Sequence, residues 1–223
     1  MRGSRKVIIV TGASSGVGLD LCRHFDKKGW RVIGLGRRVA AMKVGKVEFI
    51  KADASTLEFF TKIRAYTLTA DVLVNCAAIF TRNKIGDVSA LDINRLVDTN
   101  LKGTIYATMA CLKFMKAGNR IINISSVSAT HGIEGQSIYS STKAGINGFF
   151  ESLQVELLPR GILLTTVNAG GINTTLWDKH KYKGNRKKLL KTSDIVSLVD
   201  YIAALPPYVV LKAVTLYPSN EIH

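Results

Sequence analysis

The sequence predicts an α/β protein, a single domain built on a doubly wound parallel sheet of about seven strands with helices on both faces. Short β-branched runs alternate with longer segments of helical period, which is the pattern of repeated βαβ units. The runs are continuously apolar, as in VIIV at positions 7–10, so we expect both faces of the sheet to be buried. With 223 residues, no internal repeat and no Pro/Gly/Ser linker, the chain has the size of one domain.

Each element follows from its own stretch of sequence. The β-branched runs predict strands at 7–10, 31–35, 47–50, 72–75, 120–124, 163–167 and 213–217. The segments of helical period between them predict helices at 16–28, 57–66, 93–116, 138–158 and 195–205. One connection is unusually short, because positions 37–47 leave room for barely one helical turn.

Composition and charge narrow the class of protein. The chain is 47% apolar and 21% charged, which excludes a disordered protein, and its apolar runs are too short or too interrupted to span a bilayer. Three widely spaced cysteines and no secretory signal favour a cytoplasmic protein. The net charge of +15 favours anionic ligands or partners, although a basic solvated surface explains it equally well.

A glycine-rich loop follows the first predicted strand and opens the first helix. In VTGASSGVG, positions 10–18, Gly12, Gly16 and Gly18 remove side chains where the backbone turns tightly and where a helix N-terminus can approach a pyrophosphate. The spacing differs from the Gly-x-Gly-x-x-Gly fingerprint of other dinucleotide folds. Its place between strand and helix nevertheless predicts a nucleotide site in a Rossmann-type domain, rather than a merely structural turn.

The end of the second predicted strand selects the nucleotide. An acidic residue there would bind a ribose 2′-hydroxyl, whereas an arginine accommodates a 2′-phosphate. The sequence reads GLGRR, with Gly36 in the place of the acid and Arg37 and Arg38 following. We therefore expect NADP(H) rather than NAD(H), the alternative being two solvated arginines at the start of a loop.

Seven motifs in the same order resemble the classical branch of the short-chain dehydrogenase/reductase family, from about position 7 to 174 and more loosely to the C-terminus. They are the loop TGASSGVG, Asp53 after the third strand, NCAA at 75–78, Asn100 in DTNLKG, Ser126 in IINISS, YSSTK with Tyr139 and Lys143, and NAGGINT at 168–174. Ser126 precedes Tyr139 by the usual family spacing, and Ser125 is one residue off.

The resemblance implies the roles of the site residues. Its catalytic tetrad corresponds to Asn100, Ser126, Tyr139 and Lys143. Besides Tyr139 and Lys143, the cofactor contacts that it implies are Gly12, Ser14, Ser15, Gly16, Val17, Gly18, Arg37, Arg38, Asp53, Ala54, Asn75, Ala77, Gly170, Ile172 and Thr174. In such an enzyme NADPH supplies the hydride for the reduction of a ketone or aldehyde.

The catalytic chemistry requires a tuned tyrosine. A phenol with a pKa near ~10 is a poor acid or base at neutral pH, so we expect the Lys143 ammonium, one helical turn away, to lower the pKa of Tyr139. Tyr139 is then the general acid of a reduction, and Ser126 donates to the substrate oxygen. By resemblance, Lys143 also binds the nicotinamide ribose, and Asn100 holds a water through which Lys143 exchanges protons.

Three positions depart from the family pattern. Cys76 and Ala78 replace an Asn and a Gly, and Ala169 replaces a Pro. Alanine where glycine permits a positive φ costs on the order of 1 kcal/mol, so we expect an effect on cofactor affinity more than on chemistry. His131 is more simply an exposed loop residue than a substrate contact, and no ligand cluster indicates a metal.

The substrate loop is expected at 175–191. Its part from 179 to 191 contains seven basic residues and no acid: Lys179, Lys181, Lys183, Arg186, Lys187, Lys188 and Lys191. This segment is either a solvated lid or a rim that recruits an anionic substrate, such as a 3-oxoacyl thioester on an acyl carrier protein or coenzyme A.

Other partners follow from weaker signals. Trp177 and Tyr182 among these basic residues also suit nucleic acid or a non-catalytic NADP(H) sensor, but a sensor need not retain every catalytic residue type. The resemblance further implies a homo-oligomer, a tetramer or dimer, formed through the long helices at 94–116 and 138–158.

Overall fold

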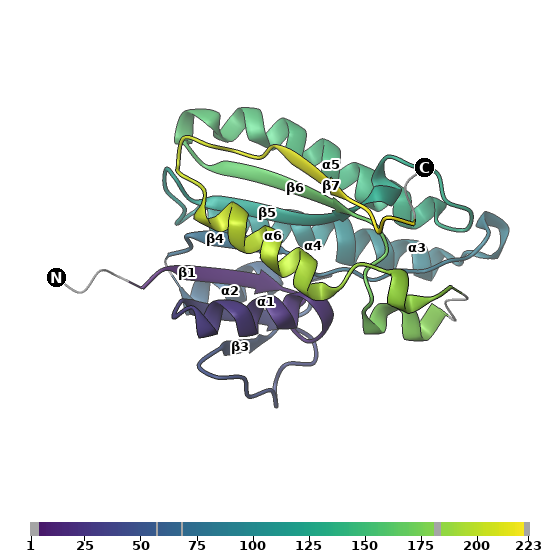
Figure 1. Cartoon of the computed structure of the whole chain (residues 1–223), viewed down its shortest axis with the longest axis horizontal. Coiled ribbons are helices and arrows are strands. Elements are labelled where there is room, and N and C mark those ends of the chain that lie inside the picture. Colours follow the sequence, from purple (N-terminus) through teal and green to yellow (C-terminus); the bar gives the residue numbers. More distant parts are fainter. Residues whose placement is uncertain (1–4, 57, 68, 181–183, 221–223) are drawn as a thin grey trace.

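Seven parallel strands form one sheet in the order β3-β2-β1-β4-β5-β6-β7 in the computed structural model, which describes residues 5–56, 58–67, 69–180 and 184–220 (Figure 1). The strands are β1 Val7–Thr11, β2 Arg31–Gly36, β3 Glu48–Lys51, β4 Val72–Asn75, β5 Arg120–Ser126, β6 Leu163–Ala169 and β7 Ala213–Leu216. All seven predicted strands are confirmed within two residues at each end. The order reverses between β1 and β4, which is where α/β sheets bind ligands.

Helices cover both faces of the sheet, as predicted. The helices α1 Gly16–Lys27 and α6 Thr192–Ala204 pack on one face, where Leu21 and Phe25 meet Val199 and Ile202. The helices α2 Glu58–Tyr66, α4 Gly103–Leu112 and α5 Ser137–Leu157 pack on the other. Two apolar cores therefore sandwich the sheet, and β1, β4 and β5 are almost fully buried.

The helix predicted at 93–116 is wrong in detail. It consists of α3 Ala90–Leu96, a π-helical segment Val97–Lys102, and α4, which ends at Leu112. The Thr104 hydroxyl donates to the Asn100 carbonyl at 2.7 Å, and side-chain bonds of this kind compete with the regular helical ladder. A Cβ on Gly103 would lie 2.7 Å from the Ala54 carbonyl oxygen, so the start of α4, just after the π-helical segment, packs closely against the loop that follows β3.

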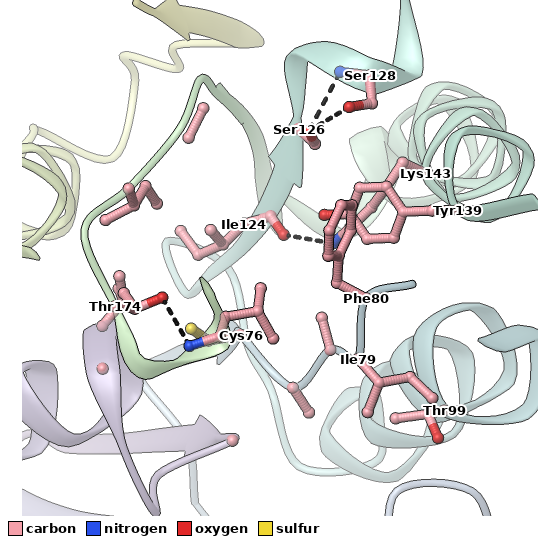
Figure 2. A pocket seen from close by; sticks show the side chains of 18 of the residues that line it. Cys76, Ile79, Phe80, Thr99, Ile124, Ser126, Ser128, Tyr139, Lys143 and Thr174 are labelled. Carbon is pink, nitrogen blue, oxygen red and sulfur yellow. Dashed lines mark hydrogen bonds between the residues drawn. The ribbon is translucent and has the colours of Figure 1, made fainter. Parts of the chain in front are cut away.

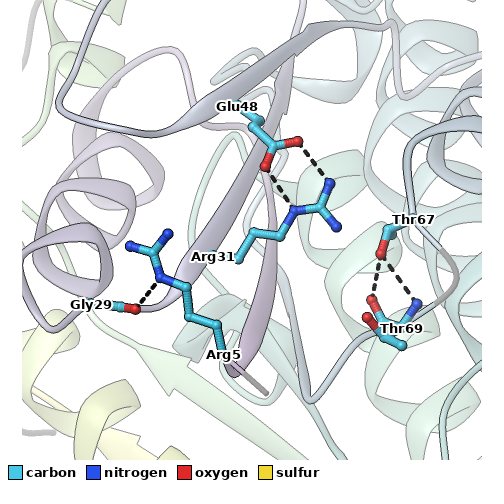
Figure 3. Close-up of polar contacts among 6 residues, drawn as sticks. All are labelled: Arg5, Gly29, Arg31, Glu48, Thr67 and Thr69. Carbon is cyan, nitrogen blue, oxygen red and sulfur yellow. Dashed lines mark hydrogen bonds and ion pairs between the residues drawn. The ribbon is translucent and has the colours of Figure 1, made fainter. Parts of the chain in front are cut away.

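No helix separates β2 from β3 in the fully described stretch 37–47, as the short connection predicts. Instead, the guanidinium of Arg31 donates to both carboxylate oxygens of Glu48, at 2.7 and 2.9 Å, and so ties β3 to β2 (Figure 3). The same view shows Arg5 donating to the Gly29 carbonyl. The half-exposed Arg31–Glu48 pair fixes the position of the edge strand more than it adds stability.

The loop between α6 and β7 is held by a buried arginine. Arg120, at the start of β5, donates to the carbonyl oxygens of Leu205, Pro206 and Val209 at 2.7–3.1 Å. These bonds satisfy carbonyls that follow the end of α6, and they bring β7 against β6. Among the described helices, none has both the length and the apolarity that crossing a bilayer requires.

Candidate active site

A cavity of about 1170 Å³ opens at the carboxyl ends of the strands. It collects most of the residues that the sequence predicted for the site, from the loop after β1 to the segment after β6. The predicted residues that line it are Gly12, Ser14, Ser15, Gly16, Val17, Arg37, Arg38, Asp53, Ala54, Ala77, Ser126, Tyr139, Lys143, Gly170, Ile172 and Thr174. One continuous space therefore extends from the glycine loop to the Tyr139 and Lys143 pair.

The glycine loop is locked to the segment after β4. Gly12 has a φ of +72°, and a Cβ there would lie 2.8 Å from the Ala77 Cα atom. The Thr11 hydroxyl oxygen accepts hydrogen bonds from the backbone amides of Cys76 and Ala77, both at 3.0 Å. Only glycine permits this close approach, which leaves the N-terminus of α1 facing the cavity.

Three predicted site residues do not line the cavity. A Cβ on Gly18 would collide with the Gly12 carbonyl oxygen, so Gly18 serves the packing of the loop on α1. Asn75 is buried and donates to the Thr108 hydroxyl at 3.1 Å, on the α4 face of the sheet. Neither residue is placed to contact a cofactor in the cavity.

Asn100, the third predicted site residue outside the cavity lining, is instead hydrogen-bonded to neighbouring segments of the chain. Its amide accepts from the Ile79 backbone N–H at 2.8 Å and donates to the Ile79 carbonyl at 3.0 Å and to the Thr142 hydroxyl at 3.2 Å. The fully buried side chain thus joins the π-helical segment to α5 and to the chain that follows β4. A water held by Asn100 stays a prediction.

Tyr139 and Lys143 lie on the buried face of α5. The Lys143 ammonium donates to the Ile124 carbonyl at 3.1 Å and lies 5.8 Å from the centre of the Tyr139 ring (Figure 2). The Ser126 hydroxyl donates to that of Ser128 at 3.1 Å. Three of the four catalytic candidates, Ser126, Tyr139 and Lys143, thus lie near the end of β5 and line the same cavity.

Burial shifts the pKa values of both groups. It raises the pKa of Tyr139 to about 12, against the opposing effect of a hydrogen bond with Ser126, because a buried phenolate lacks water. The expectation that Lys143 lowers the pKa of Tyr139 is therefore wrong for the cofactor-free protein. Burial also lowers the pKa of Lys143 to about 8. At neutral pH the phenol holds its proton, as a proton donor must.

The two arginines after β2 are exposed and line the cavity at the same end as the glycine loop. Asp53, after β3, also lines it, and one oxygen of its carboxylate accepts from the backbone N–H and the hydroxyl of Ser55 at 3.0 and 2.9 Å. This anchored carboxylate has a defined orientation. Of the three residues that depart from the family pattern, Ala169 simply continues β6, in register with Ser126 and Leu216.

Sequence reasoning missed an aromatic wall. The Phe80 ring packs edge-on against Tyr139, with centroids 4.9 Å apart, and against Trp177 at 5.4 Å. All three line the cavity. Phe80 lies five residues beyond the end of β4. Because β4 ends at the site, the position of Phe80 in the sequence could have indicated that this aromatic side chain lines the cavity.

The basic residues of the predicted rim differ in their surroundings, because one is ion-paired within the loop and others are exposed. Arg186 pairs with Asp178 and donates to the Asn173 side chain and to the Thr174 carbonyl, so it pins the loop to the end of β6. Lys187 and Lys188 are exposed. Lys181, Tyr182 and Lys183 lie outside the described residues, as do the side chains of Lys179 and His180.

Comparisons of this chain with known protein families, relatives and solved structures agree with this geometry. The family model of the short chain dehydrogenases matches residues 6–184. An NADP-dependent 3-hydroxy acid dehydrogenase of Salmonella typhi is 30% identical over 96% of this chain and 96% of its own length. An uncharacterized oxidoreductase of Staphylococcus haemolyticus is 28% identical over 96% of this chain and 97% of its own length. A serine dehydrogenase solved in closed form with NADP⁺ has a TM-score of 0.87 at 23% identity, covering 97% of this chain and 96% of that one.

Replacing Lys143 by Met should stabilise the protein at neutral pH. The folded-state pKa of about 8 lies below the ordinary value of 10.5, so the folded chain binds fewer protons than the unfolded chain between those pH values. The destabilising effect of burying the ammonium is thus complete below pH ~8 and fades as the pH rises toward ~10.5. It amounts to on the order of 3 kcal/mol.

Urea unfolding of both proteins at pH 7 and near pH 10.5 measures this effect, and the advantage of K143M should shrink at the higher pH. Lys188→Met, at an exposed position, is the matched control and should show no comparable change. A K143M protein that is less stable than wild type at pH 7 would contradict the assignment of a burial cost to Lys143.

Proposed function

The chain belongs to the short-chain dehydrogenase family, and we propose that it is an NADPH-dependent oxidoreductase that reduces a ketone or aldehyde to an alcohol, with Tyr139 as the general acid. The observation that carries the proposal is the meeting of Ser126, Tyr139 and Lys143 in the same cavity as the glycine loop. A proton donor, an oxyanion donor and a dinucleotide cradle in one space are what carbonyl reduction requires.

Residues of the first half of the chain would hold the cofactor. The α1 N-terminus with Ser14 and Ser15 suits the pyrophosphate, and the anchored Asp53 suits the adenine. The exposed Arg37 and Arg38 suit a 2′-phosphate, and the name of the Salmonella relative includes NADP. When bound, the nicotinamide supplies the hydride.

The protein's own residues supply orientation and the proton. The Ser126 hydroxyl oxygen accepts from the Ser128 backbone N–H at 3.1 Å, and its single proton, turned from the Ser128 hydroxyl toward the substrate, is donated to the carbonyl oxygen. The Ser128 hydroxyl is in turn fixed by its bond to Gln136 at 2.8 Å. The Tyr139 hydroxyl then gives its proton to the developing alkoxide. Lys143, charged below pH ~8, lines the same cavity and is suited to donate a hydrogen bond to a ribose hydroxyl.

A second candidate is the reduction of a 3-oxoacyl thioester carried by an acyl carrier protein or coenzyme A. The exposed Lys187 and Lys188 beside the cavity loop, together with the net charge of +15, favour an acidic carrier. Thioesters therefore belong in the first substrate panel. Among the described residues, no cluster of three or more metal-ligating side chains points to a metal-dependent alternative.

Replacing Tyr139 by Phe should lower kcat at least about a thousandfold, because proton donation to the alkoxide is lost. Initial rates over diketones, quinones and 3-oxoacyl thioesters measure this, and quenching of NADPH fluorescence checks that cofactor binding survives. Full activity of Y139F would contradict the mechanism. NADPH binding by the wild type without turnover of any of these carbonyls would favour a cofactor sensor instead.

Replacing both Arg37 and Arg38 by Gln should raise KM for NADPH by about 10- to 100-fold and leave KM for NADH nearly unchanged. The lost interactions are charge-assisted bonds to the 2′-phosphate, which NADH lacks. Steady-state kinetics with the two cofactors tests this, with the double variant Lys187→Gln/Lys188→Gln as a charge-matched control away from the cofactor end. A wild type that prefers NADH would overturn the cofactor assignment.

We also propose a cytoplasmic homo-oligomer, a tetramer or dimer, assembled through α4 and α5. Exposed apolar side chains on these helices support it: Met109 on α4 is 49% exposed, Val155 on α5 is 71% exposed, and Leu158 just beyond α5 is 68% exposed. Burial of such side chains between subunits would remove them from water. Light scattering should give at least twice the 24.3 kDa chain mass, and a monomeric mass would contradict this assembly.

A further inference from the structure

Two loops join at the substrate end of the cavity, and an arginine lies at their junction. The segment after β4 and the loop between β5 and α5 are connected by the Asn83 backbone N–H, which donates to the Gly135 carbonyl at 2.9 Å. Beside this bond, the Arg82 Nε donates to the Glu134 carbonyl at 3.3 Å. Gly135 has a φ of +75°, and a Cβ there would press on the Arg82 side chain at 3.1 Å. The loop is therefore shaped around Arg82.

The charged end of Arg82 is available. Arg82 is exposed and lines the cavity together with Ser126 and Tyr139. Only its Nε has a partner among the described residues, so both terminal nitrogens keep their donors for another group. A guanidinium fixed at Nε and open at its terminal nitrogens has the geometry that binds a carboxylate through two parallel hydrogen bonds.

The carboxylates nearby already have partners. Asp178 is paired with Arg186, and Glu134 lies 3.9 Å from the Lys84 ammonium. Asp92 accepts from the Ser89 hydroxyl at 2.8 Å and lies one turn from Arg95 on α3. Asp178 and Glu134 thus face cations and Asp92 has a hydroxyl donor, whereas the terminal nitrogens of Arg82 have no partner among the described residues.

The His131 ring is a second polar group of the cavity, and it is hydrogen-bonded to a residue that follows β7. The His131 ring is fixed through Nδ1, which lies 2.9 Å from the Thr130 hydroxyl and 3.2 Å from that of Tyr217, just after β7. Its other ring nitrogen has no partner among the described residues, and His131 and Tyr217 both line the cavity. His131 is an exposed loop residue, as expected, but it also lines the cavity.

The aromatic wall supplies the opposite chemistry. Phe80 is buried, and its edge-on contacts with Trp177 and Tyr139 leave an apolar surface next to the Tyr139 phenol. A carbonyl compound placed for reduction by Tyr139 therefore has both an apolar and a cationic neighbourhood within one cavity. Such a cavity discriminates between the two substituents of a ketone.

We propose that the substrate is an oxo acid, whose carboxylate binds the terminal nitrogens of Arg82 with help from His131, and whose apolar substituent packs on Phe80 and Trp177. This inference rests on the proposed function, because it names the substrate class of the same site. It assigns substrate recognition to Arg82 and His131, and it leaves the basic residues of the 179–191 segment without a role in the acid preference.

The test compares phenyl-bearing 2-oxo, 3-oxo and 4-oxo acids with their methyl esters, which differ only in the negative charge. The readout is the ratio of kcat/KM for acid over ester, with NADPH saturating. In the wild type, this ratio should exceed one by at least tenfold for the best acid. Arg82→Gln should lower the ratio at least tenfold, and His131→Gln should lower it severalfold.

Lys27→Gln is the control, because it removes one positive charge from an exposed side chain that does not line the cavity, and it should leave the ratio unchanged. Arg82→Lys, which keeps the charge without the planar fork, should retain part of the preference. An equal loss for acid and ester in R82Q would show that Arg82 only shapes the loop and would overturn the inference.

The outcomes also separate the inference from the proposed function. Reduction of the esters without an acid preference overturns the oxo acid assignment and leaves the carbonyl reductase standing. Reduction of neither acids, esters nor the other carbonyls overturns both.

Discussion

The site depends on the contact between the loop after β1 and the segment after β4, where the strand order reverses. β1 and β4 are hydrogen-bonded neighbours, but the chain leaves them toward opposite edges of the sheet. A crevice between the two departing segments is the geometric result, and the Thr11 hydroxyl closes its base by accepting two backbone N–H groups. Any side chain on Gly12 would force the two segments apart. The same contact between these two segments therefore fixes both their packing in the fold and the base of the cavity.

The Tyr139 and Lys143 pair is buried although burial disfavours the charged form of each side chain. Lys143 is 3% exposed, its ammonium has one carbonyl partner, and burial works against its charge. The helix that carries it is held in place by apolar side chains one to three turns further on, Ile146, Phe150 and Leu153, which are buried in the core beneath the sheet. Each such buried side chain contributes about 1.5–3 kcal/mol. The core of α5 thus offsets the cost of its active end.

Features that depend on residues close together in the sequence could be predicted, whereas features that depend on residues far apart in the sequence could not. The strands, the glycine loop and the Tyr139 and Lys143 pair depend on local periodicity and short spacings, and the structure places them as predicted. The π-helical segment depends on the Thr104 hydroxyl competing for a carbonyl, which periodicity does not register. Asn75 turns to α4, and Arg82 is held by a loop 52 residues away. Such pairings arise only once the chain has folded.

The order of the strands separates two tasks along the chain. Among the cavity residues, the proposed contacts before β4, from Gly12 to Ala54, are all to the cofactor, whereas the residues after it include both further cofactor contacts, such as Lys143 and Thr174, and the proposed substrate contacts Phe80, Arg82, His131 and Trp177. The short connection between β2 and β3 lies in the part before β4, away from the proposed substrate contacts. Conversely, the proposed substrate contacts come from loops whose mutual bonds, such as Asn83 to Gly135, do not involve the glycine loop. These loops can therefore change in sequence without disturbing the contacts of the glycine loop, so the proposed substrate preference can vary independently of the proposed chemistry at the end of β5.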